Sequence, residues 1–160
     1  MRHRRERGFT LIELLVVVAI IAILAAIAMM AYLSSIDRAR QRRTVADIRT
    51  IAVAWESRAS EMQSYNVAGF AFPSGAVTYD DLNAALAPTY ARVLPKTDGW
   101  GRPFEFAVGD GPKPYAIRSA GRDGVMETTE YTAGEVDNPD CDIIYANGGF
   151  VTFPVAVKSE

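Results

Sequence analysis

Residues 14–33 read LLVVVAIIAILAAIAMMAYL, twenty residues without a charged side chain. At a rise of about 1.5 Å per residue, a helix of this length crosses the apolar core of a bilayer. The chain has 160 residues, which suits one domain, and a helix this uniformly apolar would be unusual in the core of so small a domain. The stretch therefore predicts a helix inserted in a membrane.

Basic residues flank the apolar stretch on both sides, so the positive-inside rule alone does not set its orientation. An ordinary secretory signal is cut after its apolar region, and alanines near that end imitate such a site. Composition leaves this alternative open. The flanking arginines are Arg2, Arg4, Arg5 and Arg7 on one side and Arg38, Arg40, Arg42 and Arg43 on the other, and the alanines are Ala25, Ala26, Ala28 and Ala31.

A different cleavage site precedes the apolar stretch, where residues 7–13 read RGFTLIE. Cleavage between Gly8 and Phe9 would remove the basic leader and keep the helix. A carboxylate such as Glu13 costs on the order of a few kcal/mol inside an apolar environment unless it is paired. The new α-amine of Phe9, in the same chain or in a neighbour, would neutralise it. The alternative is that Glu13 lies in the headgroup layer and has no role.

Residues 8–17, GFTLIELLVV, resemble the leader site of type IV pilins and pseudopilins. The resemblance implies that a prepilin peptidase cuts after Gly8 and methylates Phe9, and that Glu13 pairs with the N-terminal amine of an adjacent subunit during assembly. It also implies a single pass through the inner membrane, with the C-terminal domain in the periplasm. Many members of the family have a proline near the position of Met30, which this chain lacks.

No glycine or proline occurs from Phe9 to Ala68, which predicts one helix over residues 9–63. Its first part, residues 9–33, is apolar all round, and its second half has a single apolar stripe at spacings of three and four. We expect residues 1–8 to be a leader and residues 64–160 a globular head. The stripe comprises Val45, Ile48, Ala52, Trp55, Ala59 and Met62.

The head reads as short strands and one short helix. A helix is predicted from Thr78 to Pro88, and strands are predicted at residues 104–108, 115–118, 143–146 and 150–155, with turn residues between the members of each pair. Residues 65–78 are predicted to be a loop. The fold class is therefore α+β and pilin-like, with a small antiparallel sheet packed on the helix stripe.

Two further segments, DGWGRPF at residues 98–104 and SAGRDG at residues 119–124, resemble the major pseudopilin of type II secretion systems. In the first segment, Asp98 is suited to bond the backbone of the turn, Gly99 and Gly101 permit unusual φ angles, and Trp100 is a large anchor. Together with the leader, the resemblance touches most of the chain.

The segment from Asp123 to Asp142 holds seven acids and no base. Solvent or a cation must screen this charge, and Ca²⁺ prefers such oxygen ligands. The spacing does not match an EF-hand, and zinc is disfavoured because the only cysteine is Cys141 and the only histidine is His3. A solvated acidic loop is the alternative.

In the resembling pseudopilins this loop, residues 119–142 here, binds calcium. The resemblance implies ligands at Ser119, Asp123, Asp140 and Asp142, with Asp137 as a replacement because residues 127–136 look inserted. It implies a structural subunit of a type II secretion pseudopilus, polymerised through its N-terminal helix to drive protein export. The implied partners are further copies in a homopolymeric filament, prepilin peptidase, the inner-membrane assembly platform and minor pseudopilins.

A type IV pilus subunit for motility, adhesion or DNA uptake is the main alternative, although a lone cysteine forbids the disulfide loop common in that class. A passive membrane tether is another. The net charge of −2 falls to −5 without residues 1–8, and no aromatic residues interleave with the arginines, so nucleic acid is not an expected partner. The mature chain has no histidine and no nucleophile–base set, so we do not expect an enzyme.

Overall fold

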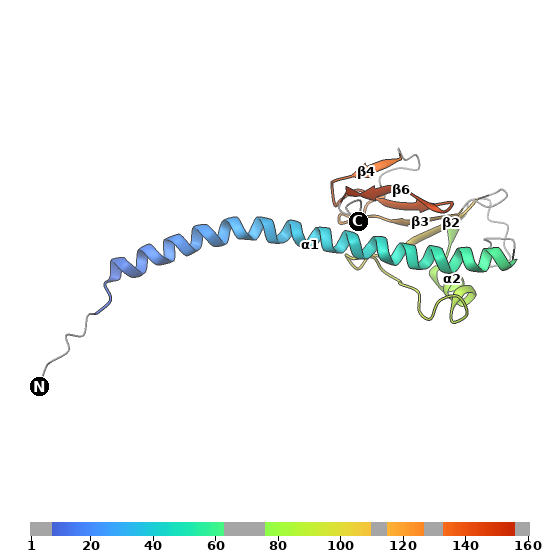
Figure 1. Cartoon of the computed structure of the whole chain (residues 1–160), viewed down its shortest axis with the longest axis horizontal. Coiled ribbons are helices and arrows are strands. Elements are labelled where there is room, and N and C mark those ends of the chain that lie inside the picture. The colour runs from blue at the N-terminus through green and yellow to red at the C-terminus, as the bar shows by residue number, and fades with distance from the viewer. Residues whose placement is uncertain (1–7, 63–75, 110–114, 127–132, 156–160) are drawn as a thin grey trace, which may run out of the picture. The chain divides into compact units, whose positions relative to one another are not determined.

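The computed structural model describes residues 8–62, 76–109, 115–126 and 133–155. The chain divides into two compact units, residues 1–36 and residues 37–160. The fold is α+β, as the sequence predicts (Figure 1). In chain order the elements are α1 (Leu11–Met62), β1 (Ala76–Val77), α2 (Tyr79–Leu86), β2 (Glu105–Val108), β3 (Tyr115–Ser119), β4 (Gly134–Val136), β5 (Ile143–Ala146) and β6 (Gly149–Pro154).

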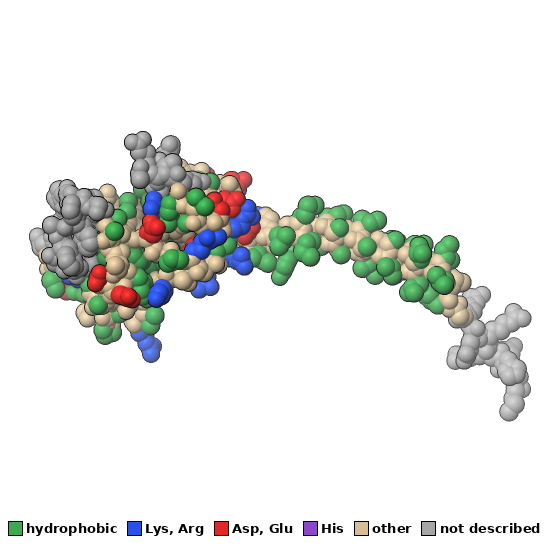
Figure 2. All heavy atoms as spheres, turned by 180° about the vertical axis from the view of Figure 1, so that it is seen from behind, with side chains coloured by type: hydrophobic (Ala, Val, Ile, Leu, Met, Phe, Trp, Pro, Cys, Tyr) green, Lys and Arg blue, Asp and Glu red, His purple; other side chains and the backbone are tan. Residues whose placement is uncertain are grey.

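Helix α1 is the long helix that the absence of glycine and proline predicts; it begins two residues later than predicted, and residue 63 lies outside the described residues. Residues 8–35 are all exposed, and Figure 2 shows hydrophobic side chains along this part of the helix. Such a surface is unfavourable in water and requires a lipid or protein environment.

The second half of α1 buries the predicted stripe, with one exception. Trp55 and Ile48 are fully buried, whereas Met62 is 59% exposed, so the prediction for Met62 was wrong. Met62 is the last residue of the helix and lies beyond the packed face. The helix also buries Gln41, Thr44, Ile51 and Ala54, which widens the stripe.

The six strands form one sheet in the order β1-β2-β3-β5-β6-β4. Strands β2 and β3 pair antiparallel, as do β5 and β6, so both predicted strand pairs are confirmed. The sheet is mostly antiparallel, as predicted, and the exception is β4, which pairs parallel to β6. Strands β1 and β4 have two and three residues and lie at the two edges, where pairing needs no alternating side-chain pattern that the sequence would reveal.

The core joins α1, α2 and the strands in one hydrophobic cluster. Trp55 is its centre: its ring lies 5.0 Å from that of Tyr115 and 6.3 Å from that of Phe106, with the latter pair edge to face. Aromatic pairs in this geometry contribute beyond the area that they bury. Helix α2 begins at its predicted cap, where Thr78 accepts a hydrogen bond from the backbone of Asp81, and contributes the buried Leu82 and Leu86.

The carboxylate of Glu56 lies beside this aromatic cluster. Glu56 Oε1 accepts hydrogen bonds from the hydroxyls of Tyr115 and Tyr145, the second at 3.3 Å. Burial, followed by the bond to Glu56, raises the pKa of Tyr115 far above its usual range. Burial also raises the pKa of Tyr145. Both phenols are thereby held neutral between the helix and the sheet.

Alkaline pH should destabilise the head. A raised folded-state pKa means that stability is present below the unfolded tyrosine pKa of about 10 and is lost as pH rises above it. Tyr115→Phe should flatten this decline, at a loss of about 1 kcal/mol at neutral pH from the missing hydrogen bond. Thermal unfolding of the full chain in detergent, followed between neutral and alkaline pH, measures both effects. Identical alkaline slopes for the two proteins would contradict the assignment.

Candidate functional site

The chain before α1 is open and non-helical. Phe9 is 74% exposed, and a Cβ built on Gly8 meets nothing within 4 Å. The peptide bond between Gly8 and Phe9 therefore lies in an accessible segment, which is the form of chain that peptidases cut. Residues 1–7 lie outside the described residues.

Glu13 takes part in a capping box with Thr10 at the start of α1. Its Oε2 accepts the backbone N–H of Thr10 at 2.9 Å and the Thr10 hydroxyl at 2.9 Å, while the Glu13 backbone N–H donates to Thr10 Oγ1 at 3.3 Å. These reciprocal bonds satisfy donors that a helix start otherwise leaves open. The negative charge also lies at the positive end of the helix dipole. Pairing of Glu13 with an N-terminal amine stays a prediction.

Within the described part of the chain, α1 is the one helix long and apolar enough, by length and composition, to cross a membrane. Between Phe9 and Ile36, Glu13 is the only charged side chain. One carboxylate thus accompanies an otherwise uncharged surface.

A second arrangement of charges surrounds Arg122, in the turn after β3. Its guanidinium contacts both oxygens of Asp140, with Nε–Oδ1 and Nη2–Oδ2 distances of 2.7 Å. Its Nη1 lies 2.9 Å from Asp37 Oδ2 on α1. Hydrogen bonding to Arg122 lowers the pKa of Asp140, and hydrogen bonds to Asp140 and then Asp37 raise the pKa of Arg122. No sequence pattern indicated a role for Arg122 or Asp37.

The segment 98–104 docks on α1 beside this cluster. Asp98 is 1% exposed, and its Oδ1 accepts the backbone N–H groups of Trp100 and Arg102, both at 2.9 Å. The role predicted for Asp98 is therefore confirmed. Gly99 donates its backbone N–H to Thr44 Oγ1 at 2.9 Å.

The two glycines of this segment differ in role. Gly101 has the predicted unusual conformation, with φ of +85°. At Gly99 the requirement is space, because a Cβ there would lie 2.3 Å from the backbone oxygen of Arg40. Glycine at position 99 lets the loop touch the backbone of α1.

Two of the expected calcium ligands are engaged within the chain. The Ser119 hydroxyl is buried and donates to Asp98 Oδ2 at 2.8 Å. Both carboxylate oxygens of Asp140 are bonded by Arg122. Both side chains are therefore bonded to other parts of the chain in this structure.

The other three expected ligands lie in different environments. Asp123 Oδ1 accepts the backbone N–H of Val125 at 2.9 Å, Asp137 is exposed, and Asp142 is 1% exposed. Among the described residues, no three histidine, cysteine, aspartate or glutamate side chains form a group able to hold a metal ion. Glu127 and Glu130 fall outside the described residues. Calcium binding stays a prediction that the described residues do not fit.

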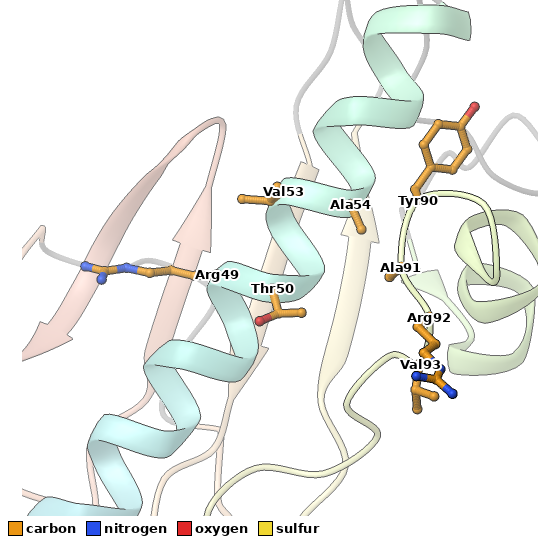
Figure 3. Close-up of a pocket in the computed structure, with 8 residues that line it drawn as sticks. All are labelled: Arg49, Thr50, Val53, Ala54, Tyr90, Ala91, Arg92 and Val93. Carbon is orange, nitrogen blue, oxygen red and sulfur yellow. The ribbon is translucent and has the colours of Figure 1, made fainter.

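A groove of about 630 Å³ lies between α1 and the segment after α2 (Figure 3). Its lining supplies apolar contacts and two arginines but no carboxylate, histidine or cysteine. The hydroxyls of Thr50 and Tyr90 therefore have no carboxylate or imidazole in this lining that would act as a base toward them. The lining residues are Arg49, Thr50, Val53, Ala54, Tyr90, Ala91, Arg92 and Val93.

Residues 3–29 match the family described as the prokaryotic N-terminal methylation motif. The chain is also 34% identical over 137 residues to the type II secretion system core protein G of Pseudomonas aeruginosa, an alignment that covers 78% of this chain and 89% of the relative. The chain belongs to this pseudopilin family. No solved structure gave a significant match.

The resemblance to pseudopilins found in the sequence is thus confirmed, and the methylation motif covers Gly8, Phe9 and Glu13. The individual roles of these residues in the pseudopilin stay predictions, as do the domain boundaries at residues 8 and 63. Arg122 gave no sequence signal of its own, because it occupies a position without a fixed residue type in the segment 119–124. Its partner Asp37 lies 85 residues away in the chain.

The close contact between Gly99 and the backbone of α1 predicts that this pseudopilin does not tolerate a side chain at position 99. Gly99→Ala should force the loop off α1 and lower the free energy of unfolding by about 2 kcal/mol, as overpacking does. Gly134→Ala is the matched control, since a Cβ there meets nothing within 4 Å. It should change stability by less than about 0.5 kcal/mol. Denaturant titration followed by tryptophan fluorescence measures both variants, and equal stabilities would contradict the proposed contact.

Proposed function

We propose that the chain is a structural subunit of a type II secretion pseudopilus. The relationship to core protein G over most of the chain is the observation that carries this proposal. The exposed apolar half of α1, with its single carboxylate, supplies the physical means of assembly. The methylation motif is common to type IV pilus subunits, so it is the named relative that favours secretion.

The apolar half of α1 explains why such a subunit needs two environments. In the membrane, lipid covers this surface, and in a filament the same surface of neighbouring copies covers it. Glu13 would be unfavourable in either environment without a cation. The α-amine of Phe9, created by cleavage, supplies one that only the processed subunit has.

The proposal places the leader in the cytoplasm, the apolar half of α1 in the inner membrane and the head in the periplasm. The proposed partners are prepilin peptidase, the inner-membrane assembly platform, minor pseudopilins and further copies of this chain. Polymerisation would move exported protein mechanically, without a chemical step in the subunit. We accordingly propose no catalytic residues.

Processing is the first test. The subunit recovered from membranes of cells with prepilin peptidase should lack residues 1–8 and carry a methyl group on Phe9. Gly8→Leu should keep its leader, and this failure would report recognition by the peptidase because a Cβ at position 8 meets no described residue within 4 Å. Intact mass and N-terminal sequencing decide. An N-terminus at Met1 or beyond residue 30 in the unaltered protein would exclude the proposal.

Assembly is the second test. Glu13→Gln keeps the shape of the side chain and removes its charge, so we expect normal processing and membrane insertion but a roughly tenfold or greater loss of filaments. Glu61→Gln is the matched control on the exposed end of α1. Filaments sheared from cells and the membrane fraction are quantified together. If Glu13→Gln assembled as well as the control, the charge of Glu13 would have no role in assembly, and if the unaltered chain formed no filaments either, it would be a passive tether.

A further inference from the structure

The guanidinium of Arg122 occupies the centre of the charged arrangement that includes an expected calcium ligand. The side chain and backbone of Arg122 together contact four residues, which lie in three other segments of the unit 37–160. Besides Asp140 and Asp37, the Arg122 backbone N–H donates to Pro139 O at 2.9 Å, and its backbone oxygen accepts from Arg102 Nη2 at 2.6 Å. One residue therefore joins the turn 121–124, the loop 138–142, α1 and the segment 98–104.

The backbone on either side of this contact is packed without intervening space. Gly121 has φ of +63°, and a Cβ on it would lie 2.7 Å from the backbone oxygens of Asp140 and Cys141. The Cys141 backbone N–H donates to Asn138 O at 3.2 Å, which closes the loop as a turn. The backbone of the turn 121–124 is therefore in direct contact with the backbone of the loop 138–142.

In this contact two carboxylates, of Asp140 and Asp37, surround the positive charge of Arg122. A planar guanidinium presents paired N–H donors that fit both oxygens of a carboxylate, and the remaining donor reaches a second carboxylate. The side chains of Asp37 and Asp140 are 18% and 31% exposed, so solvent screens the pairs only in part. A Ca²⁺ ion would need the same Asp140 oxygens and would place a second cation beside Arg122.

We propose that the Arg122 guanidinium is the cation that holds the loop 138–142 against the turn 121–124 and α1, in place of a bound metal ion. The head of this chain then keeps its loop ordered without divalent cations. Arg122 acts as a positioning residue for the loop. This inference concerns folding of the unit 37–160 and is independent of whether the chain assembles into a pseudopilus.

The test uses the full chain in detergent, with and without a calcium chelator and then with millimolar calcium. Thermal unfolding is followed by tryptophan fluorescence, to which Trp100 contributes beside the cluster, its Nε1 lying 3.5 Å from Asp37 Oδ1. We expect the same Tm in all three solutions. A fall in Tm on chelation, restored by calcium, would overturn the proposal and establish a calcium site instead.

Variants separate the role of Arg122 from a general loss of charge. Arg122→Gln should lower Tm by about 5 °C, and Arg122→Lys should recover only part of this because an ammonium cannot pair both oxygens in parallel. Arg43→Gln is the control: it removes the same charge from a surface pair with Asp47, at 3.5 Å on α1, and should leave Tm unchanged. A wild-type Tm in Arg122→Gln would overturn the proposal.

Amide hydrogen exchange provides a local readout that does not depend on Tm. In Arg122→Gln the amides of residues 122 and 141 should exchange at least tenfold faster, while those of β2 and β3 stay protected. Unchanged protection at 122 and 141 would count against the proposal. If Arg122→Gln fails to fold, the same comparison is made with Arg122→Lys, and the chelator experiment on the unaltered protein still decides.

Discussion

Burial of one stripe of α1 against the sheet is the interaction on which the rest of the head depends. Trp55 lies against the rings of Phe106 and Tyr115, so that helix and strands share a single core. Replacing such a side chain by alanine typically costs about 3–5 kcal/mol, a large fraction of the stability of a small domain. The same helix includes the exposed and mostly apolar residues 11–35, so one element serves two environments.

Hydrophobic packing has no direction, and polar contacts fix where along α1 the head is attached. The loop at Gly99 touches the backbone at Arg40 and bonds Thr44, and Arg122 reaches Asp37. All three contacts lie at the start of the unit 37–160, before the most deeply buried part of the stripe. Hydrogen bonds and close approach are sensitive to displacements of less than a residue, so they define a register that the core alone would leave loose.

In the proposed assembly, as in the head, apolar packing supplies the attraction and a polar group fixes the position. An apolar helix surface without charge has no specificity for a particular neighbour, because dispersion and exclusion of water act on any apolar contact. In the proposed filament, the carboxylate of Glu13, which Thr10 holds at the helix start, would introduce a position at which neighbouring helices must match.

The sequence by itself determined the long helix, its apolar half, the stripe, both principal strand pairs and the family, because these depend on periodicity, helix-breaking residues and local motifs. Edge pairing of β4, the exposure of Met62 and the partners of Arg122 were decided by tertiary structure alone. Edge strands pair through backbone groups, which are common to nearly all residue types and so leave no side-chain pattern. The Arg122 cluster joins residues 37, 122 and 140, and no local pattern records which acids an arginine will meet once the chain is folded.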